Sequence, residues 1–188
     1  MSTLITLGII IVLLIYCIGL YNHLVTVKHA VAKAWANIDV LLKQRHDELP
    51  KLVEVCQQYK QFEQVTLQKV IEARSQVQSA REHQDIPALG QAESMLRAGL
   101  GGLFEVAEAY PELRANENFM QLQHRITSLE NGIADRRELY NEAVNINNVQ
   151  IEVFPASIIA KLFSFGEKPL LEFSSTEKSD VNMKQLFN

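Results

Sequence analysis

The sequence predicts an all-α protein, in which an N-terminal transmembrane helix precedes an antiparallel up-down four-helix bundle. Three observations lead to this prediction. The chain begins with an apolar run that is long enough to cross a bilayer. The rest of the chain repeats its apolar residues at steps of three and four and shows no strand-type alternation. A chain of 188 residues is also long enough to form one domain with a core.

The apolar run extends from residue 4 to residue 20 and reads LITLGIIIVLLIYCIGL. No Lys, Arg, Asp or Glu occurs before Lys28. A cleaved signal peptide is the alternative, but the run lacks a basic start and a small-x-small cleavage site. A lipoprotein signal is disfavoured because Tyr16, a large residue, precedes Cys17. We therefore expect residues 1–24 to form an uncleaved transmembrane anchor.

The charges that flank the run predict its orientation. The basic residues that follow it outnumber Asp39; they are Lys28, Lys33, Lys43 and Arg45. The positive-inside rule places this side in the cytoplasm and the N-terminus outside. The same basic segment could contact anionic lipid headgroups, so membrane lipid is an expected partner.

The overall composition excludes some classes of protein. The net charge of −4 argues against a general nucleic-acid-binding surface. The two cysteines cannot frame a fold, because Cys17 lies in the apolar run and Cys56 lies on a helical apolar stripe. We expect Cys56 to be a core thiol.

Residues 25–154 carry the helical pattern of the predicted bundle. The first inward stripe consists of Trp35, Ile38, Leu42, Arg45, Leu49, Leu52, Cys56 and Tyr59. Its phase continues through Pro50, which we interpret as a kink inside a helix. An unbroken helix from 25 to 83 would be about 87 Å long, so we expect a break near residues 60–62. The turn chemistry there is poor, and an arrangement of three long helices remains the alternative.

The next helix is expected over residues 87–110. Asp85 is its predicted N-cap, and Pro87 lies in its first turn. Gly99, Gly101 and Gly102 cluster inside it, although glycine disfavours helix. Close approach of a neighbouring helix would explain them, and a flexible kink is the alternative.

The turn EAYPELRANENFMQLQ separates this helix from the last long helix, which we expect over residues 117–154. Pro111 ends the first helix and Asn116 caps the second. The second helix carries the inward stripe Phe119, Leu122, Ile126, Leu129, Ile133, Arg136, Tyr140 and Val144. Capping alone does not explain every side chain of the turn. We therefore expect an interaction surface formed by Tyr110, Arg114, Asn118 and Phe119.

The segment 155–173 is expected to begin with a short amphipathic helix. Its apolar residues are numerous for so short a piece, and one basic residue accompanies them: Ile158, Ile159, Lys161, Leu162 and Phe163. This helix either lies in the headgroup region with Lys161 outward or plugs the open end of the bundle. The remaining residues, 174–188, are polar without a period and are expected to form a loose tail.

Five stretches occur in an informative order and spacing. They are YNHLV (21–25), AWANIDVLLKQRHDELPKLVEV (34–55), EAYPELRANENFMQLQ (108–123), ENGIADRRELYNEAV (130–144) and FPASIIAKLFSF (154–165). Together they resemble the LemA family of bacterial membrane proteins over residues 1 to about 173. The resemblance implies a membrane anchor, a helical-bundle domain and a place in the bacterial cytoplasmic (inner) membrane. Where the family often has a His near the second helix, this chain reads Lys60-Gln61-Phe62-Glu63, so no metal is assigned there.

No catalytic set is recognisable in the sequence. His46, Asp47 and Glu48 are adjacent, so on a helix they point in different directions, and no second His follows at the spacing of a zinc protease helix. No glycine-rich phosphate loop and no activated Ser or Cys is present. We expect no enzymatic activity and no cofactor.

Charged residues on the inward stripes are the remaining chemical feature. They are Arg45, Glu63, Arg74 and Arg136, with Asp39 and Glu130 as further candidates. Because a buried charge must be paired, we expect interhelical ion pairs, and a polar cleft that binds a peptide or small ligand is the alternative.

Two functional hypotheses follow from these features. The first is a membrane-anchored scaffold that binds other membrane proteins or itself. The second is a membrane-tethered sensor or regulator that binds a ligand inside the bundle.

Overall fold

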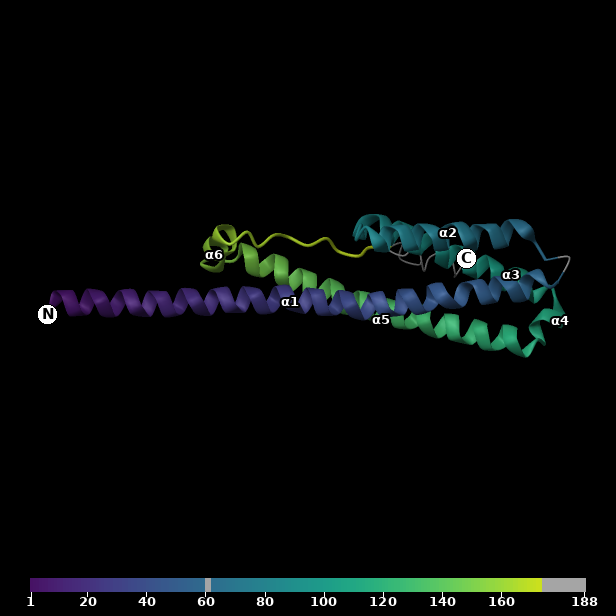
Figure 1. Cartoon of the computed structure of the whole chain (residues 1–188), viewed down its shortest axis with the longest axis horizontal. Helices are drawn as coiled ribbons and strands as arrows, with labels where there is room; N and C mark the ends of the chain where they lie inside the picture. The colour runs from purple at the N-terminus through teal and green to yellow at the C-terminus, as the bar shows by residue number, and fades with distance from the viewer. Residues whose placement is uncertain (60–61, 174–188) are drawn as a thin grey trace, which may run out of the picture. The chain divides into compact units, whose positions relative to one another are not determined.

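The structure is a computed structural model that describes residues 1–59 and 62–173 (Figure 1). All regular secondary structure in these residues is α-helical, which confirms the predicted all-α fold. The helices are α1 (Ser2–Gln57), α2 (Gln64–Glu82), α3 (Ile86–Glu108), α4 (Pro111–Arg114), α5 (Glu117–Glu152) and α6 (Ala156–Leu162). The predicted break is confirmed, because α1 ends at Gln57 and α2 begins at Gln64. The predicted tail, 174–188, lies outside the described residues.

The chain forms two compact units. Unit 1 consists of Met1–Ile38 with Arg136–Leu170, and unit 2 consists of Asp39–Asp135 with the residues from Leu171 onward. Helices α1 and α5 each contribute one end to unit 1 and the other end to unit 2.

In unit 1, the start of α1 carries the predicted apolar run, and its side chains are exposed. The large apolar residues from Leu4 to Ile18 are all at least 48% exposed. Of the described residues, those of α1 alone form a helix that is long and apolar enough to cross a membrane. Burial begins near Leu24, which is 2% exposed. Beyond it, Val27, Val31 and Ile38 continue a buried stripe.

The last part of α5 and the segment that follows α6 complete unit 1. The Trp35 ring of α1 meets the Tyr140 ring of α5 edge-on, with 5.9 Å between the ring centroids. Residues 163–170 then return along α5 (Figure 1). Asn148 binds this returning segment with both polar atoms of its side-chain amide. Its Nδ2 donates to the Lys168 carbonyl and its Oδ1 accepts from the Lys168 backbone amide, each at 2.9 Å. The Tyr140 hydroxyl donates to the Pro169 carbonyl at 3.1 Å.

In unit 2, α2 and α3 form a hairpin and lie side by side (Figure 1). The predicted N-caps are confirmed: Asp85 accepts from the Ala88 amide at 3.0 Å, and Asn116 accepts from the Phe119 amide at 3.1 Å. The core combines apolar residues of every long helix, namely Leu42, Leu49, Leu52, Cys56, Leu67, Val70, Leu89, Leu96, Leu103, Phe119 and Ile126. Burial raises the pKa of the Cys56 thiol to about 12, in keeping with the predicted core thiol.

Pro50 lies inside α1 as predicted. Because proline has no amide hydrogen, the carbonyl of His46 loses its helical partner four residues on. The side chain of Arg74 replaces that partner, since its Nε donates to the His46 carbonyl at 3.0 Å. A residue of α2 therefore satisfies the backbone group that the proline of α1 leaves free.

Close approach of a neighbouring helix, the predicted reason for the glycine cluster of α3, applies to only one of its three residues. A Cβ on Gly99 would lie 3.4 Å from Cγ2 of Val70 in α2, in ordinary van der Waals contact, so α2 approaches the helix closely at this residue without requiring a glycine. Nothing lies within 4 Å of a Cβ on Gly101 or Gly102, and close packing does not explain them. The tightest approach is at Gly90, where a Cβ would lie 2.0 Å from the Glu172 carbonyl oxygen.

Candidate functional site

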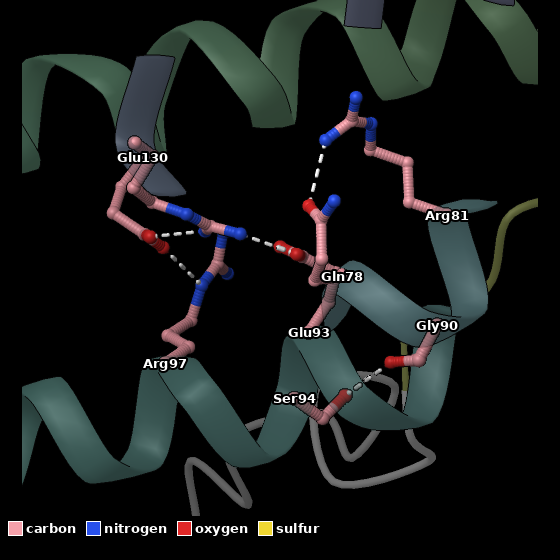
Figure 2. Close-up of polar contacts among 8 residues, drawn as sticks. Gln78, Arg81, Gly90, Glu93, Ser94, Arg97 and Glu130 are labelled. Atoms are coloured by element: carbon pink, nitrogen blue, oxygen red, sulfur yellow. Dashed lines mark hydrogen bonds and ion pairs between the residues drawn. The ribbon is translucent and has the colours of Figure 1, made fainter. Parts of the chain in front are cut away.

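The most buried polar group of unit 2 is a cluster around Arg45. The Arg45 guanidinium, which is 1% exposed, donates from α1 to Glu93 of α3 and to Glu130 of α5. Arg97 of α3 also meets Glu130, with 3.4 Å between Nε and Oε2. Figure 2 shows Glu93, Glu130 and Arg97 converging on this point. Two arginines and two carboxylates balance in charge, and they connect three helices.

The environment of the cluster favours a charged arginine. Burial alone would lower the pKa of Arg45, but the carboxylates of Glu93 and Glu130 outweigh burial and hold the pKa above its ordinary value. Burial raises the pKa of Glu93, and Arg45 offsets part of this effect. Arg45 Nε is buried without a hydrogen-bond partner. One donor of the guanidinium is therefore left unsatisfied inside the cluster.

Of the four predicted interior charges, the structure places only Arg45 in an interior ion pair. Glu63 is exposed because it is the N-cap residue of α2, and the phase of α1 does not continue past the break. Arg136 is exposed, and its charged end can reach water from the edge of the stripe. Arg74 is half-buried, and its described partners are the His46 carbonyl and ring. These placements correct the prediction.

The sequence pattern did not lead us to predict Glu93 and Arg97 as members of an interior ion pair. Glu93 occupies an inward position of α3, four residues after Leu89 and three before Leu96, both of which are buried. A carboxylate at such a position was a usable signal, since it requires a partner. The further candidate Asp39 accepts from Arg81 Nε at 2.6 Å near the unit surface.

The turn 110–119 is mostly explained by packing. The Tyr59 hydroxyl donates to the Glu112 carbonyl at 3.3 Å and accepts from Asn116 Nδ2 at 3.4 Å. Tyr110 is half-buried, and its ring lies 5.5 Å from that of Phe62. Phe119 is 1% exposed and belongs to the core, which corrects its assignment to a surface. Of the predicted interaction residues, Arg114 and Asn118 are exposed.

Helix α6 packs against α1 at the point where the apolar run ends. Ile159 and Ala160 form a cluster with Leu24, with Leu20 and Phe165 packed against it. Ile159, predicted at a membrane interface, is therefore a packing residue, as the alternative of an end plug expected. The opposite side of α6 remains apolar and exposed, because Ile158 is 57% and Leu162 is 72% exposed. Phe163, which follows the helix, is 54% exposed. Lys161 is exposed as predicted.

Aromatic rings fix α6 beside α1. The Tyr21 ring lies 4.8 Å from that of Phe163 and 5.9 Å from that of Phe165, measured between centroids. Lys28 Nζ lies 5.9 Å from the Phe165 centroid. Such tilted and edge-on pairs stabilise by about 0.5–1.5 kcal/mol each beyond the burial of area. The apolar side of α6 is thereby held level with the end of the apolar run.

A groove of about 410 Å³ lies between α2 and α3 in unit 2. Its lining includes Lys69 and Glu72 of α2 and Met95 of α3, and it is open where Gly99 and Gly102 lack side chains. Among residues 1–59 and 62–173, no group of three or more His, Cys, Asp or Glu side chains is arranged to hold a metal ion.

The chain matches known proteins over most of its length. The model of the LemA family matches residues 34–184. The protein LemA of Metamycoplasma hominis is 25% identical over 171 residues, which cover 91% of this chain and 77% of that protein. The magnetosome proteins MamQ 1 and MamQ 2 of Paramagnetospirillum magneticum are each 21% identical over 190 residues, which cover 89% of this chain and 70% of each relative.

These relatives and the apolar helix of α1 fit a membrane-associated protein. The family model covers α1 from residue 34 onward and the whole of α2 to α6, so the match includes the helices of unit 2 and the end of α5 with α6. On this match, the chain belongs to the LemA family.

Proposed function

We propose that this chain is a single-pass protein of the bacterial inner membrane whose helical domain acts as a scaffold for other membrane proteins or for copies of itself, without catalysing a reaction. The observation that carries the proposal is the apolar side of α6, which is exposed and held beside the end of the apolar run. Apolar side chains beside the end of a membrane span would enter the boundary between headgroups and acyl chains. The membrane would then fix both the span and the domain.

The orientation follows from the charges that remain exposed. Lys28, Lys33 and Lys43 are exposed after the span, and the positive-inside rule places them in the cytoplasm. The N-terminus would then lie outside and the helical domain inside. Labelling a cysteine placed at Ser2 or at Lys33 with an impermeant reagent, in intact cells, tests this orientation; labelling at Lys33 alone would contradict it.

The scaffold role is tested by crosslinking the full-length chain in intact membranes, followed by affinity capture and mass spectrometry. We expect either a self-crosslinked ladder or the same membrane protein in each repeat. The double variant Arg114→Ala with Asn118→Ala tests the exposed part of the turn. If every captured partner persists in this variant, the turn is not the contact surface. If no partner exceeds the background of an unrelated single-pass protein, the scaffold role is wrong.

The groove between α2 and α3 favours a second candidate function, a membrane-tethered sensor that binds a peptide or small ligand. Lys69 and Glu72 supply charges of both signs beside the apolar Met95. Filling the groove with Gly102→Leu should then remove any small molecule that copurifies with the chain and is identified by native mass spectrometry. An unchanged ligand content would exclude the groove as the binding site.

A further inference from the structure

Helix α5 carries a second exposed apolar feature in unit 1, which none of the contacts above uses. Leu139, Ile146, Val149 and Val153 are each between 46% and 48% exposed. We call these residues the outer α5 stripe. They follow one another at steps of seven, three and four. At about 100° per residue they gather on one side of the helix, opposite the buried Tyr140 and Val144.

The outer α5 stripe contrasts with the neighbouring part of α1. Among the described residues 21–38 of α1, Tyr21 is the only large apolar side chain that is exposed. The outward side of α1 is therefore polar beyond the span, as expected for a helix surface in water. The outward side of α5 departs from this rule at four positions, which leaves one apolar side of the helix exposed.

The spacing of the stripe identifies the kind of partner. Leu139, Ile146 and Val153 are separated by whole heptads, and Val149 occupies the second apolar position of a heptad. This a/d pattern is that of a helix that packs against another helix in a coiled coil. On either side of the stripe, Asn145 and Gln150 occupy the positions that face one another across a parallel pair. Both are uncharged, so two identical copies would not repel each other there.

We propose that the outer α5 stripe is a pairing surface for a second copy of this chain. The inference rests on the proposed membrane anchor, because copies in one bilayer share their direction and their height. Each residue of the stripe then meets its own counterpart in the other copy. Confinement to the membrane also raises the effective concentration, so that a stripe of about two heptads suffices where free helices would need more.

Glu142 is the polar position within the stripe. It lies between Leu139 and Ile146 at the second core position of its heptad, and it is exposed. In a symmetric pair its carboxylate faces the same carboxylate of the other copy, which weakens the pair. The pair is therefore weaker than one with an apolar residue at this position, and replacing the carboxylate with an apolar side chain strengthens it.

Cysteine crosslinking of the full-length chain in isolated membranes tests the pairing. The background variant Cys17→Ala removes the exposed thiol, while Cys56 is buried and its raised pKa keeps it protonated. Single cysteines replace Ile146 or Val153, and the control replaces Asn37, which is exposed on α1 and takes no part in the stripe. After mild oxidation, we expect disulfide-linked dimers from the two stripe positions and background levels from the control.

The outcomes separate the pairing from the membrane anchor. The same samples are fractionated, and the anchor fails if the chain leaves the membrane with alkaline carbonate. The pairing fails if the chain stays in the membrane and the stripe positions crosslink no more than Asn37→Cys. It also fails if the stripe positions crosslink to a different protein instead of a second copy.

A gain-of-function variant keeps the test independent of folding. Glu142→Leu, combined with Ile146→Cys, should raise the crosslinked fraction above that of Ile146→Cys alone. The control change Glu167→Leu, at an exposed position outside α5, should leave the fraction unchanged. A crosslinked fraction that does not respond to Glu142→Leu would overturn the pairing through this stripe.

Discussion

One arginine connects three helices of unit 2. Arg45 of α1 meets Glu93 of α3 and Glu130 of α5, and both Arg45 and Glu93 are at most 2% exposed. Removing one member of such a buried set leaves an unpaired charge in a medium of low dielectric constant. Replacing all members of the set with apolar groups leaves no unpaired charge. We therefore expect the cluster to fix how the helices align more than to raise stability.

Arg45→Met should lower the free energy of unfolding by about 3–5 kcal/mol, because Glu93 loses its partner. The combined variant Arg45→Met, Glu93→Leu and Glu130→Gln should recover most of this loss. Thermal and chemical unfolding of the full-length chain in detergent micelles measures both. A combined variant that is less stable than Arg45→Met would show that the cluster stabilises the fold in its own right.

Pro50 and Arg74 form a coupled pair, since the proline frees the His46 carbonyl that Arg74 binds. Arg74→Ala should cost about 1–3 kcal/mol, as expected for a lost charge-assisted hydrogen bond. In the background Pro50→Ala, the new backbone amide satisfies the carbonyl, and the same change should cost less. A double-mutant cycle measures the difference. Equal costs in the two backgrounds would contradict the coupling.

His46 should make stability depend on pH. Burial, followed by the positive charges of Arg74 and Arg81, lowers the pKa of His46 below its ordinary value of 6.5. Arg74 donates to Nε2 at 2.6 Å, so the neutral ring carries its proton on Nδ1, which is buried without a partner. The unfolded state therefore takes up a proton as the pH falls through 6.5, while the folded state resists, and stability falls. His46→Gln should flatten this part of the stability profile; an unchanged profile would contradict the assignment.

At the scale of residues, the sequence predicted positions better than partners. Arg45 was expected in the interior because it continues a stripe that begins at Trp35. Glu63 was wrongly assigned because its phase was counted across a break, where a new helix sets a new phase. Arg136 has the right spacing, but a long side chain can reach water from the edge of a stripe. Which carboxylates surround Arg45 depends on tertiary packing, which periodicity does not encode.

At the scale of elements, helix α3 has glycines of two kinds. At Gly90 the backbone of the C-terminal segment approaches so closely that no Cβ fits, because the contact atom is the Glu172 carbonyl oxygen. At Gly101 the space beside the helix is open. The two positions share one helix, so they form a matched pair for the same substitution.

Gly101→Ala should stabilise the chain by about 0.5–1 kcal/mol, because alanine favours helix and meets no obstacle. Gly90→Ala should destabilise it and detach the buried Leu171 and Phe173. Unfolding midpoints in detergent and limited proteolysis near residue 171 measure the two effects. This account of the contact would be contradicted if Gly101→Ala were cleaved faster than the unchanged chain, or if Gly90→Ala were cleaved no faster than the unchanged chain.

The sequence predicted the helices and their caps well, since Asp85 and Asn116 act on neighbouring amides. Of the two interpretations of the 155–165 segment, packing against the protein describes the side of α6 that carries Ile159, while membrane contact of the other side stays a prediction. Ile159 packs against α1, while Ile158 and Leu162 face outward. Local pattern predicts that a helix has two sides but not which side meets the protein. The return of residues 163–170 along α5 was not predicted, because it depends on side-chain amides such as that of Asn148.

At the scale of the whole molecule, the apolar run and the helical period were sufficient to predict an all-α protein with a candidate span. The division of α1 and α5 between two compact units was not predicted, because a continuous helix carries no local signal where its partners change. The LemA family match supports a membrane setting but names no partner. The central claim is therefore that α6 meets the membrane beside the span.

Lipid quenching of a fluorophore at α6 tests this claim most directly. The full-length chain, in the Cys17→Ala background, is labelled at Leu162→Cys and reconstituted with lipids that carry a nitroxide near the headgroup. The control label is placed at Glu138→Cys, which is exposed and lies about 21 Å further along α5 from the end of that helix. We predict strong quenching at Leu162 and little at Glu138. Fluorescence at Leu162 that is quenched no more than at Glu138 would contradict the claim.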